Sequence, residues 1–314
     1  MKLNAIALAL GLISSSAFAG MAIQIDPDGA AGADGVQNVL SLGWNNGNSI
    51  SLPTDFGAVV PEPTGIIQTY GQGSLGTFNG AGGVIGGLGL NSGYEWTYVF
   101  GAQELAFTTN AGPVSIATFQ TVAGGDNFFS VYYGAKDSSD VNGTGFTNGT
   151  LVMAGTIRPD SATSLAGIFT RTNPALVDLD LNGDNNYVGV QSTQGTGATK
   201  LTADLGYVNS DFIKTQVNQL VLTLDTFNSQ PFDKVDPSSC FTDGAGNAVN
   251  GAGPNNAGGT CLKSAIGAIN GESGPAIMFQ TRATVDFNYV PEPGSMALAG
   301  AGLLSLLGLR RKRA

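Results

Sequence analysis

The chain has 314 residues with 47 Gly, two Cys and no His, and only 11% of its residues are charged. Without histidine it can build neither a Ser-His-Asp or Cys-His nucleophile nor a His-ligated zinc site. Abundant Gly without a Gly-X-Y period excludes collagen and favours a turn-rich β protein. Between Gly20 and Val290 there are 8 basic and 22 acidic residues, a net charge of −14, which disfavours nucleic-acid binding.

The first 19 residues have the pattern of a secretory signal peptide. Lys2 precedes the apolar run Ala5 to Ile13, and Ala17 and Ala19 occupy the small-residue positions of a cleavage site. We expect export through the Sec pathway and cleavage by signal peptidase before Gly20. A buried N-terminal helix is the alternative interpretation.

The body that follows alternates apolar and polar residues in several stretches, as half-buried strands do. The apolar faces of three such stretches are Tyr94, Trp96, Tyr98 and Phe100; Leu220, Leu222 and Leu224; and Phe279, Ala283, Val285 and Phe287. Further strands are expected around residues 66–70, 128–133, 151–156, 187–191 and 201–207, with turns such as 45–48 and 80–83 and one helix over 211–219. We predict one exported all-β domain, residues 20–289, folded as an antiparallel β-sandwich with long Gly/Asn-rich loops; a jelly roll is one topology that fits.

The two cysteines, Cys240 and Cys261, enclose a Gly/Asn-rich loop. In an exported protein an isolated pair is most simply a disulfide. Closing a loop of this size would stabilise the fold by about 3 kcal/mol. Two free thiols are the alternative.

An acidic loop at residues 178–184 matches the first half of a calcium-binding loop. Its oxygen-bearing side chains at alternate positions are Asp178, Asp180, Asn182 and Asp184. Gly189 stands where an EF-hand would place its closing Glu, so an EF-hand is contradicted. Ca²⁺ bound by these four residues is one hypothesis, and a solvated Asx turn between strands is the other.

Other motifs that could carry chemistry are weaker. Gly71 to Gly76 satisfies the dinucleotide fingerprint, but the Gly-rich segment after it cannot form the helix that should hold the pyrophosphate. A glycosidase needs two facing carboxylates, and the body has four Glu: Glu62, Glu95, Glu104 and Glu272. Glu95 lies beside Trp96 and Tyr98, which suggests a sugar platform. Alternation, however, puts Glu95 on the opposite face, so these aromatic residues fit a core better, and we expect no enzyme.

The C-terminal segment, residues 290–314, has three parts. Pro291, Glu292 and Pro293 come first, and an uncharged apolar stretch, Met296 to Leu309, follows. The basic cluster that ends the segment is Arg310, Arg311, Lys312 and Arg313. We predict an apolar helix that is marginally long enough for transient insertion into the inner membrane, with the basic end held on the cytoplasmic side.

This tail resembles the PEP-CTERM sorting signal of exported proteins. The resemblance implies that an exosortase recognises Pro291, Glu292 and Pro293. It also implies export in a Gram-negative bacterium that makes extracellular polysaccharide, and delivery to the cell surface or the medium. A second Pro-Glu-Pro, at residues 61–63, lacks the basic cluster after it, so we interpret it as a loop.

Short segments of the body resemble the flocculation-associated PEP-CTERM proteins. They are Ile25 to Gly29, Gly43 to Asn48, Asn127 to Tyr133, Gly143 to Phe146 with Gly149 to Leu151, and Met278 to Gln280. The resemblance implies a non-enzymatic extracellular protein that helps cells and exopolysaccharide to aggregate. A lectin-like carbohydrate-binding module and, less favoured, a carboxylate glycoside hydrolase remain as alternatives.

Overall fold

The computed structural model describes residues 22–30, 35–53, 64–111, 114–159, 163–170, 176–182, 191–226, 232–238, 240–250 and 277–288. The first strands are β1 (Ile23–Ile25), β2 (Gln37–Val39), β3 (Ser41–Pro53), β4 (Thr64–Gly80), β5 (Gly83–Val84), β6 (Glu95–Ala111), β7 (Val114–Thr121) and β8 (Phe128–Gly134). The others are β9 (Thr150–Ile157), β10 (Thr163–Thr170), β11 (Leu176–Asp178), β12 (Gln191–Val208), β13 (Gln219–Thr226), β14 (Cys240–Thr242), β15 (Ala248–Asn250) and β16 (Ile277–Asn288). The all-β prediction is confirmed. The expected signal peptide, C-terminal helix and domain boundaries lie outside the described residues.

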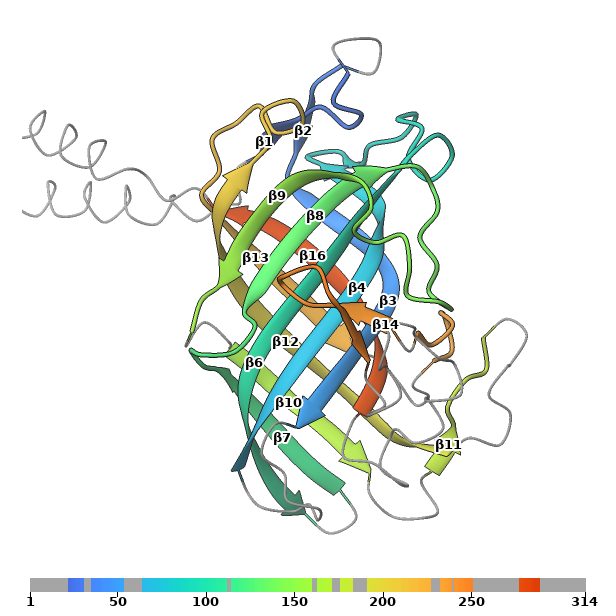
Figure 1. Cartoon of the computed structure of the whole chain (residues 1–314), viewed down its shortest axis with the longest axis vertical. Coiled ribbons are helices and arrows are strands. Elements are labelled where there is room, and N and C mark those ends of the chain that lie inside the picture. The colour runs from blue at the N-terminus through green and yellow to red at the C-terminus, as the bar shows by residue number, and fades with distance from the viewer. Residues whose placement is uncertain are drawn as a thin grey trace, which may run out of the picture.

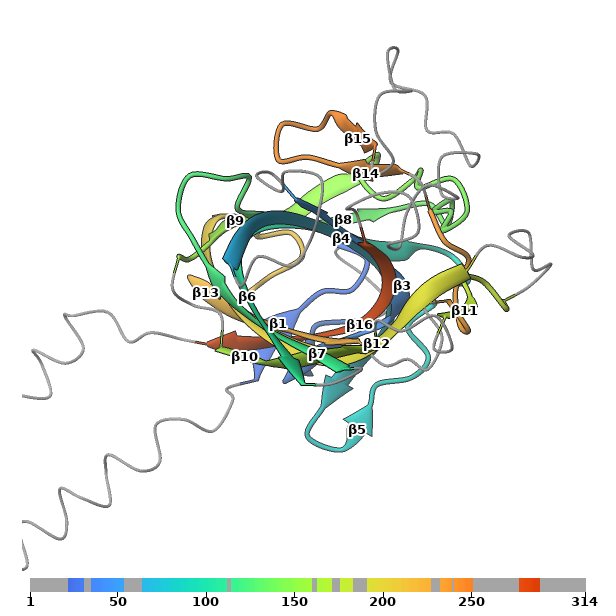
Figure 2. The same cartoon turned by 90° about the horizontal axis from the view of Figure 1, so that it is seen from below.

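One 12-stranded antiparallel sheet dominates the molecule. Its order is β10-β7-β6-β8-β9-β12-β13-β16-β3-β4-β5, with β11 paired to β12. Two further pairings, β4 with β6 and β10 with β12, bring the sheet back onto itself, so that the strands surround a common core when viewed end-on (Figure 2). Opposite halves of the sheet face each other across this core, as the two layers of a sandwich do, while the closure leaves few free strand edges.

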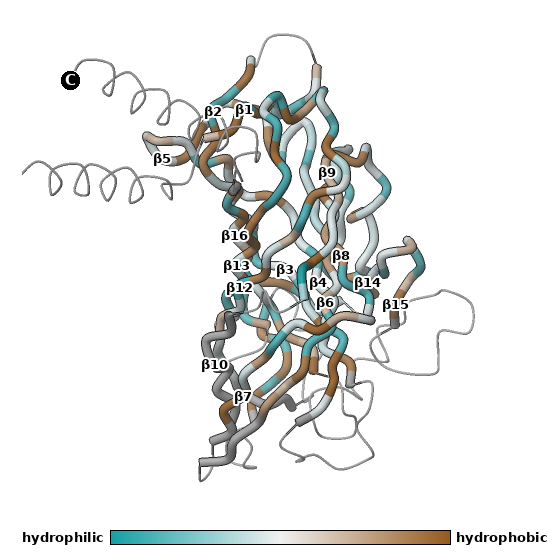
Figure 3. Tube along the Cα trace, turned by 90° about the vertical axis from the view of Figure 1, so that its left-hand side faces the viewer, coloured by the Kyte–Doolittle hydropathy of each residue, from teal (hydrophilic) through white to brown (hydrophobic). Residues whose placement is uncertain are grey.

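The inner face of the sheet carries the main hydrophobic core. Trp96 and Tyr98 of β6 are completely buried there, and the alternation along the strands is visible in Figure 3. The ring of Trp96 meets that of Phe78 edge-on at 5.3 Å, and Trp44 meets Tyr98 in the same way at 4.7 Å. The predicted apolar faces in β6 and β13 are therefore confirmed, and the aromatic residues of β6 belong to the core.

One end of the closed sheet is covered by β1 and the chain before β13 (Figure 1). The helix predicted over residues 211–219 is wrong. Only a single turn forms at residues 210–212, and the chain then runs beside β1, where Asp26 N donates to Phe212 O at 2.7 Å and Lys214 N donates to Gln24 O at 2.8 Å. These bonds use backbone groups that a helix would need, because β1 supplies a strand partner that the local sequence does not reveal.

The turn predicted at residues 45–48 is also wrong, since these residues lie inside β3. The register between β3 and β4 shifts between Trp44 and Asn48, so the Asn-Gly sequence forms an irregularity within the strand. Gly47 is needed there because a Cβ would lie 2.1 Å from Gln72 O. The turn predicted at residues 80–83 is confirmed between β4 and β5.

Part of the outer face of the sheet is covered by two segments. The first is the β8–β9 loop, residues 135–149, and the second, the hairpin segment, comprises residues 232–250 with β14 and β15. The hairpin lies across β4 in Figure 1 and outside the ring of strands in Figure 2. A second apolar cluster fills the space beneath: Ile50, Tyr70, Leu179, Phe232, Val235, Phe241 and Met278. The sheet is thus buried on both faces in this region.

Candidate functional site

The predicted targeting residues belong to the two ends of the chain. The cleavage-site residues Ala17 and Ala19, the motif residues Pro291, Glu292 and Pro293, and the basic cluster at 310–313 all lie outside the described residues. In the ranges that are described, no helix is long and apolar enough to cross a membrane.

Of the two cysteines, only Cys240 is among the described residues. Cys240 begins β14 and is buried, with 7% of its surface exposed. Cys261 lies outside the described residues. The disulfide therefore stays a prediction.

The acidic loop after β11 forms an Asx turn where it is described. Asp180 is buried and its Oδ1 accepts a hydrogen bond from Asn182 N at 2.8 Å, whereas Asp178 is exposed at the end of the strand. Asp184 falls outside the described residues. In the described ranges no three Asp, Glu, His or Cys side chains are grouped as they would be around a metal ion. Calcium at this loop stays a prediction, and the turn accounts for Asp180 and Asn182.

The dinucleotide-like sequence Gly71 to Gly76 lies inside β4, where it is paired with β3 and β6. Its glycines make room for the core, because a Cβ on Gly71 would lie 2.2 Å from the ring of Phe100. The strand continues to Gly80, so no helix begins here. A phosphate-binding turn at this sequence has no structural basis.

Glu95 has a structural role on the outer face, opposite Trp96 as alternation predicted. Its Oε1 accepts hydrogen bonds from Asp137 N at 3.0 Å and Ser138 N at 2.7 Å, and its Oε2 accepts one from Ser138 Oγ at 2.7 Å. With 3% of the residue exposed, the carboxylate is enclosed by the β8–β9 loop. It anchors this loop to the sheet.

Glu104 lies further along the same strand but on the inner face. Its Oε2 accepts a hydrogen bond from Thr69 Oγ1 at 3.1 Å, and burial raises the pKa of this carboxyl to about 7. Glu95 and Glu104 are about 30 Å apart along β6 at about 3.3 Å per residue. Glycosidase pairs are about 5–10 Å apart, so these two acids do not form one. The other two candidates, Glu62 and Glu272, lie outside the described residues.

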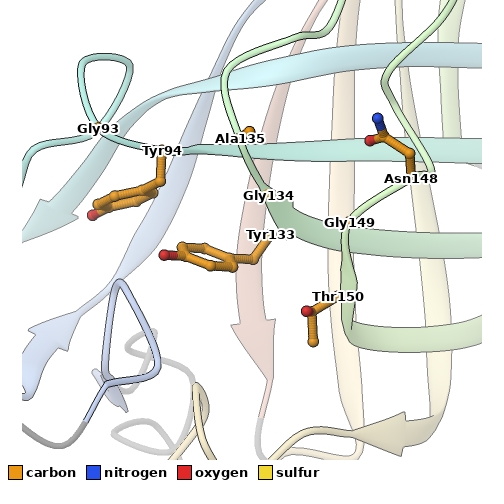
Figure 4. A pocket seen from close by; sticks show the side chains of 8 residues that line it. All are labelled: Gly93, Tyr94, Tyr133, Gly134, Ala135, Asn148, Gly149 and Thr150. Carbon is orange, nitrogen blue, oxygen red and sulfur yellow. The ribbon is translucent and has the colours of Figure 1, made fainter.

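A solvent-open hollow of about 520 Å³ lies where β8 ends and β9 begins. Tyr94 and Tyr133 lie side by side at one side of it, with ring centroids 5.2 Å apart, and Asn148 and Thr150 stand on the other chain segment (Figure 4). Gly149 forms part of the wall because a Cβ there would lie 2.3 Å from Tyr133 O. The backbone can approach this closely only at glycine.

The lining of the hollow suits a neutral polar ligand. An amide, hydroxyls and backbone groups offer hydrogen bonds beside two aromatic rings, and none of the eight lining residues is acidic or basic. Asn148 is held in place by its Nδ2, which donates to Asp137 Oδ2 at 2.9 Å. That Asn148 and Tyr94 line one hollow could not be predicted from the sequence, because it depends on the pairing of β6 with β8.

Comparison with known proteins identifies the C-terminal segment. Residues 290–313 match the family model of the PEP-CTERM protein-sorting motif, which confirms the sequence prediction. No curated protein and no solved structure matches the chain. The motif defines a class of exported proteins that an exosortase processes. This chain carries the motif at residues 290–313, which implies export, anchoring in the membrane through the C-terminal segment and sorting by an exosortase.

Proposed function

We propose that the protein is a non-enzymatic component of the extracellular matrix or cell surface that promotes cell aggregation together with exopolysaccharide. The sorting motif at residues 290–313 is the observation that carries the proposal, because it directs the chain outward. The similarity of its body segments to flocculation-associated proteins supports the finer role.

The body is consistent with contact to a hydrated polymer. Its net charge of −14 keeps it soluble, and its exposed carboxylates include Asp178, Asp204 and Asp286. Carboxylates on the protein and the polymer can share divalent cations. Glu95, which precedes Trp96 in β6, already holds the β8–β9 loop through its carboxylate.

Gene deletion in the host tests the proposal. We expect flocs to become smaller or to disappear, and the full chain supplied in trans to restore them. A chain shortened to end at Tyr289 is the matched control, since it keeps the body and loses the sorting segment; we expect it to restore flocculation poorly. Unchanged flocculation after deletion would overturn the proposal.

A lectin-like module is the second candidate, and the hollow beside Tyr133 is the observation that favours it. Tyr133→Ala would remove a ring from its wall. Tyr207→Ala is a matched control, because Tyr207 is exposed on β12, outside the lining of the hollow. Selective binding to one oligosaccharide on a glycan array, lost in Tyr133→Ala alone, would favour the lectin over a broadly adhesive matrix protein.

The hydrolase alternative has a direct assay. An enzyme of this kind would release reducing ends from the producer's own polysaccharide. We expect no release, and sustained release by the purified chain would contradict the non-enzymatic role.

A further inference from the structure

The two covering segments meet at a buried polar junction above β3 and β4. Asn48, which is completely buried, connects them: its Nδ2 lies 3.3 Å from Asp140 O and 3.4 Å from Asp140 Oδ1. Its Oδ1 accepts a hydrogen bond from Ser238 N at 3.3 Å. The junction therefore holds the β8–β9 loop and the hairpin segment against the same strand.

Gln72 is the register partner of Asn48 on β4 and is also completely buried. Its Nε2 donates to Cys240 O at 2.9 Å, a carbonyl that also accepts from Ser238 Oγ at 3.0 Å. This bond places the amide between the sheet and the hairpin segment. Its other atom, Oε1, is buried without a hydrogen-bond partner. A buried amide oxygen without a partner is destabilising, and a hydrogen-bond donor or a cation would satisfy it.

Two carboxyl groups share the junction. Burial, followed by the negative charges of Asp236 and Glu95, raises the pKa of Asp140 to about 7. Asp236 Oδ1 is buried and also lacks a hydrogen-bond partner. The ion pairs found in the described residues are Arg158–Asp204, Lys214–Asp26 and Lys234–Asp233. None of them neutralises the junction, and buried like charges without a counter-ion are costly.

We propose that this junction binds Ca²⁺, with the carboxylates of Asp140 and Asp236 and the Oε1 of Gln72 as ligands. Ca²⁺ takes carboxylate and amide oxygens and tolerates irregular geometry, so backbone oxygens or water can complete its shell. Two carboxylates rather than three or four place the affinity in the weak range, about 10⁻⁴ to 10⁻³ M, that extracellular modules use. The ion would join the loop, the hairpin segment and the sheet. The site is separate from the acidic loop at Asp178 and goes beyond the proposed function.

Thermal unfolding of the full chain in EDTA and in 5 mM CaCl₂ tests the proposal. We expect Ca²⁺ to raise the Tm of the natural chain and to have no such effect on Asp236→Asn. In EDTA, Asp236→Asn should be at least as stable as the natural chain, because it removes a repulsion. Asp178→Asn is the matched control and should keep the full Ca²⁺ shift.

Loss of the Ca²⁺ effect in Asp236→Asn could also result from misfolding, so a second variant is designed to gain Ca²⁺ affinity. Gln72→Glu adds a third carboxylate, so we expect a lower Tm in EDTA and a Ca²⁺ affinity at least tenfold higher by titration calorimetry. The absence of a Ca²⁺ shift in the natural chain would overturn the proposal. A shift that survives Asp236→Asn, or one that disappears in Asp178→Asn, would overturn it as well.

Discussion

The two faces of the closed sheet are stabilised by different interactions. The inner face is mainly apolar, and Trp96, Tyr98 and Phe100 of β6 pack there against other apolar side chains. The covered part of the outer face carries buried polar side chains, among them Asn48 and Gln72, that hold the covering segments through hydrogen bonds. Apolar contacts tolerate exchange for residues of similar size, whereas a buried polar group is costly as soon as one partner is lost.

Truncating the inner face should produce the largest effect. Trp96→Ala removes a fully buried ring that packs edge-on against Phe78 and, at 5.8 Å, against Phe212, and it deletes the 2.8 Å hydrogen bond from Nε1 to Pro27 O. We expect the free energy of unfolding to fall by about 3–5 kcal/mol. Denaturant titration measures it, and a loss below about 1 kcal/mol would contradict a core role for this residue.

Glu104 is a buried acidic residue on the inner face and should make stability depend on pH. Its pKa is about 7 in the folded protein against 4.5 when unperturbed, because burial disfavours the ionised form. Below pH 4.5 both states are protonated and stability is unaffected. As pH rises from 4.5 to 7 the unfolded chain ionises first, so stability falls by about 3 kcal/mol at about 1.36 kcal/mol per pKa unit.

Glu104→Gln tests this pH dependence, because the amide stays neutral and can still accept from Thr69. We expect the variant to be more stable than the natural chain at pH 8, by up to about 3 kcal/mol, and nearly equal to it at pH 4. Unfolding curves at both pH values measure the difference. Equal stability at pH 8 would mean that Glu104 ionises freely in the folded protein.

The inner face was the part that sequence could predict. Strict alternation identified the apolar residues of β6 and β13, because a strand exposes every second residue to one face. The closure of the sheet was not predictable, since the pairing of β4 with β6 depends on contacts between distant segments. The turn predicted at residues 45–48 and the helix predicted at 211–219 were wrong for a related reason. In each segment, backbone groups that a turn or helix would use form hydrogen bonds with a neighbouring strand instead.

The candidate sites were predicted less well than the fold. Motif spacing identified the sorting signal, which is a linear code. It also singled out Asp178 and Asp180, but not Asp140 and Asp236, which belong to the two segments that cover the sheet. The burial of Gln72, within the Gly71 to Gly76 sequence, was not predicted, because a polar residue at an outward-facing strand position is normally expected to be exposed. Three-dimensional sites of this kind depend on the chain's long-range contacts.

On the outer face, Glu95→Gln should loosen the β8–β9 loop while leaving the sheet folded. The amide cannot reproduce all three accepted hydrogen bonds at Asp137 and Ser138, so we expect a loss of about 1.5–3 kcal/mol. Hydrogen exchange should accelerate within residues 135–149 and remain slow in β13. Asp137→Asn is the control, because its exposed side chain contacts only Asn148 among the bonds described for it. Unaltered exchange in Glu95→Gln would show that the loop is held by other contacts.

The uncovered part of the outer face should respond least. Arg158 Nε and Asp204 Oδ2 are 3.1 Å apart, but their side chains are 53% and 55% exposed, so water screens the pair and both side chains lose mobility in forming it. We expect Asp204→Asn to change the free energy of unfolding by less than about 0.5 kcal/mol, and 1 M NaCl to remove even that difference. Asp204 and Glu95 are both carboxylates on the outward face, and only Glu95 is enclosed by a loop. If the loss of stability is large for Glu95→Gln and small for Asp204→Asn, burial and not charge alone determines how much each carboxylate contributes. A loss above about 1.5 kcal/mol in Asp204→Asn would show that the uncovered strands obey the same rule as the covered ones.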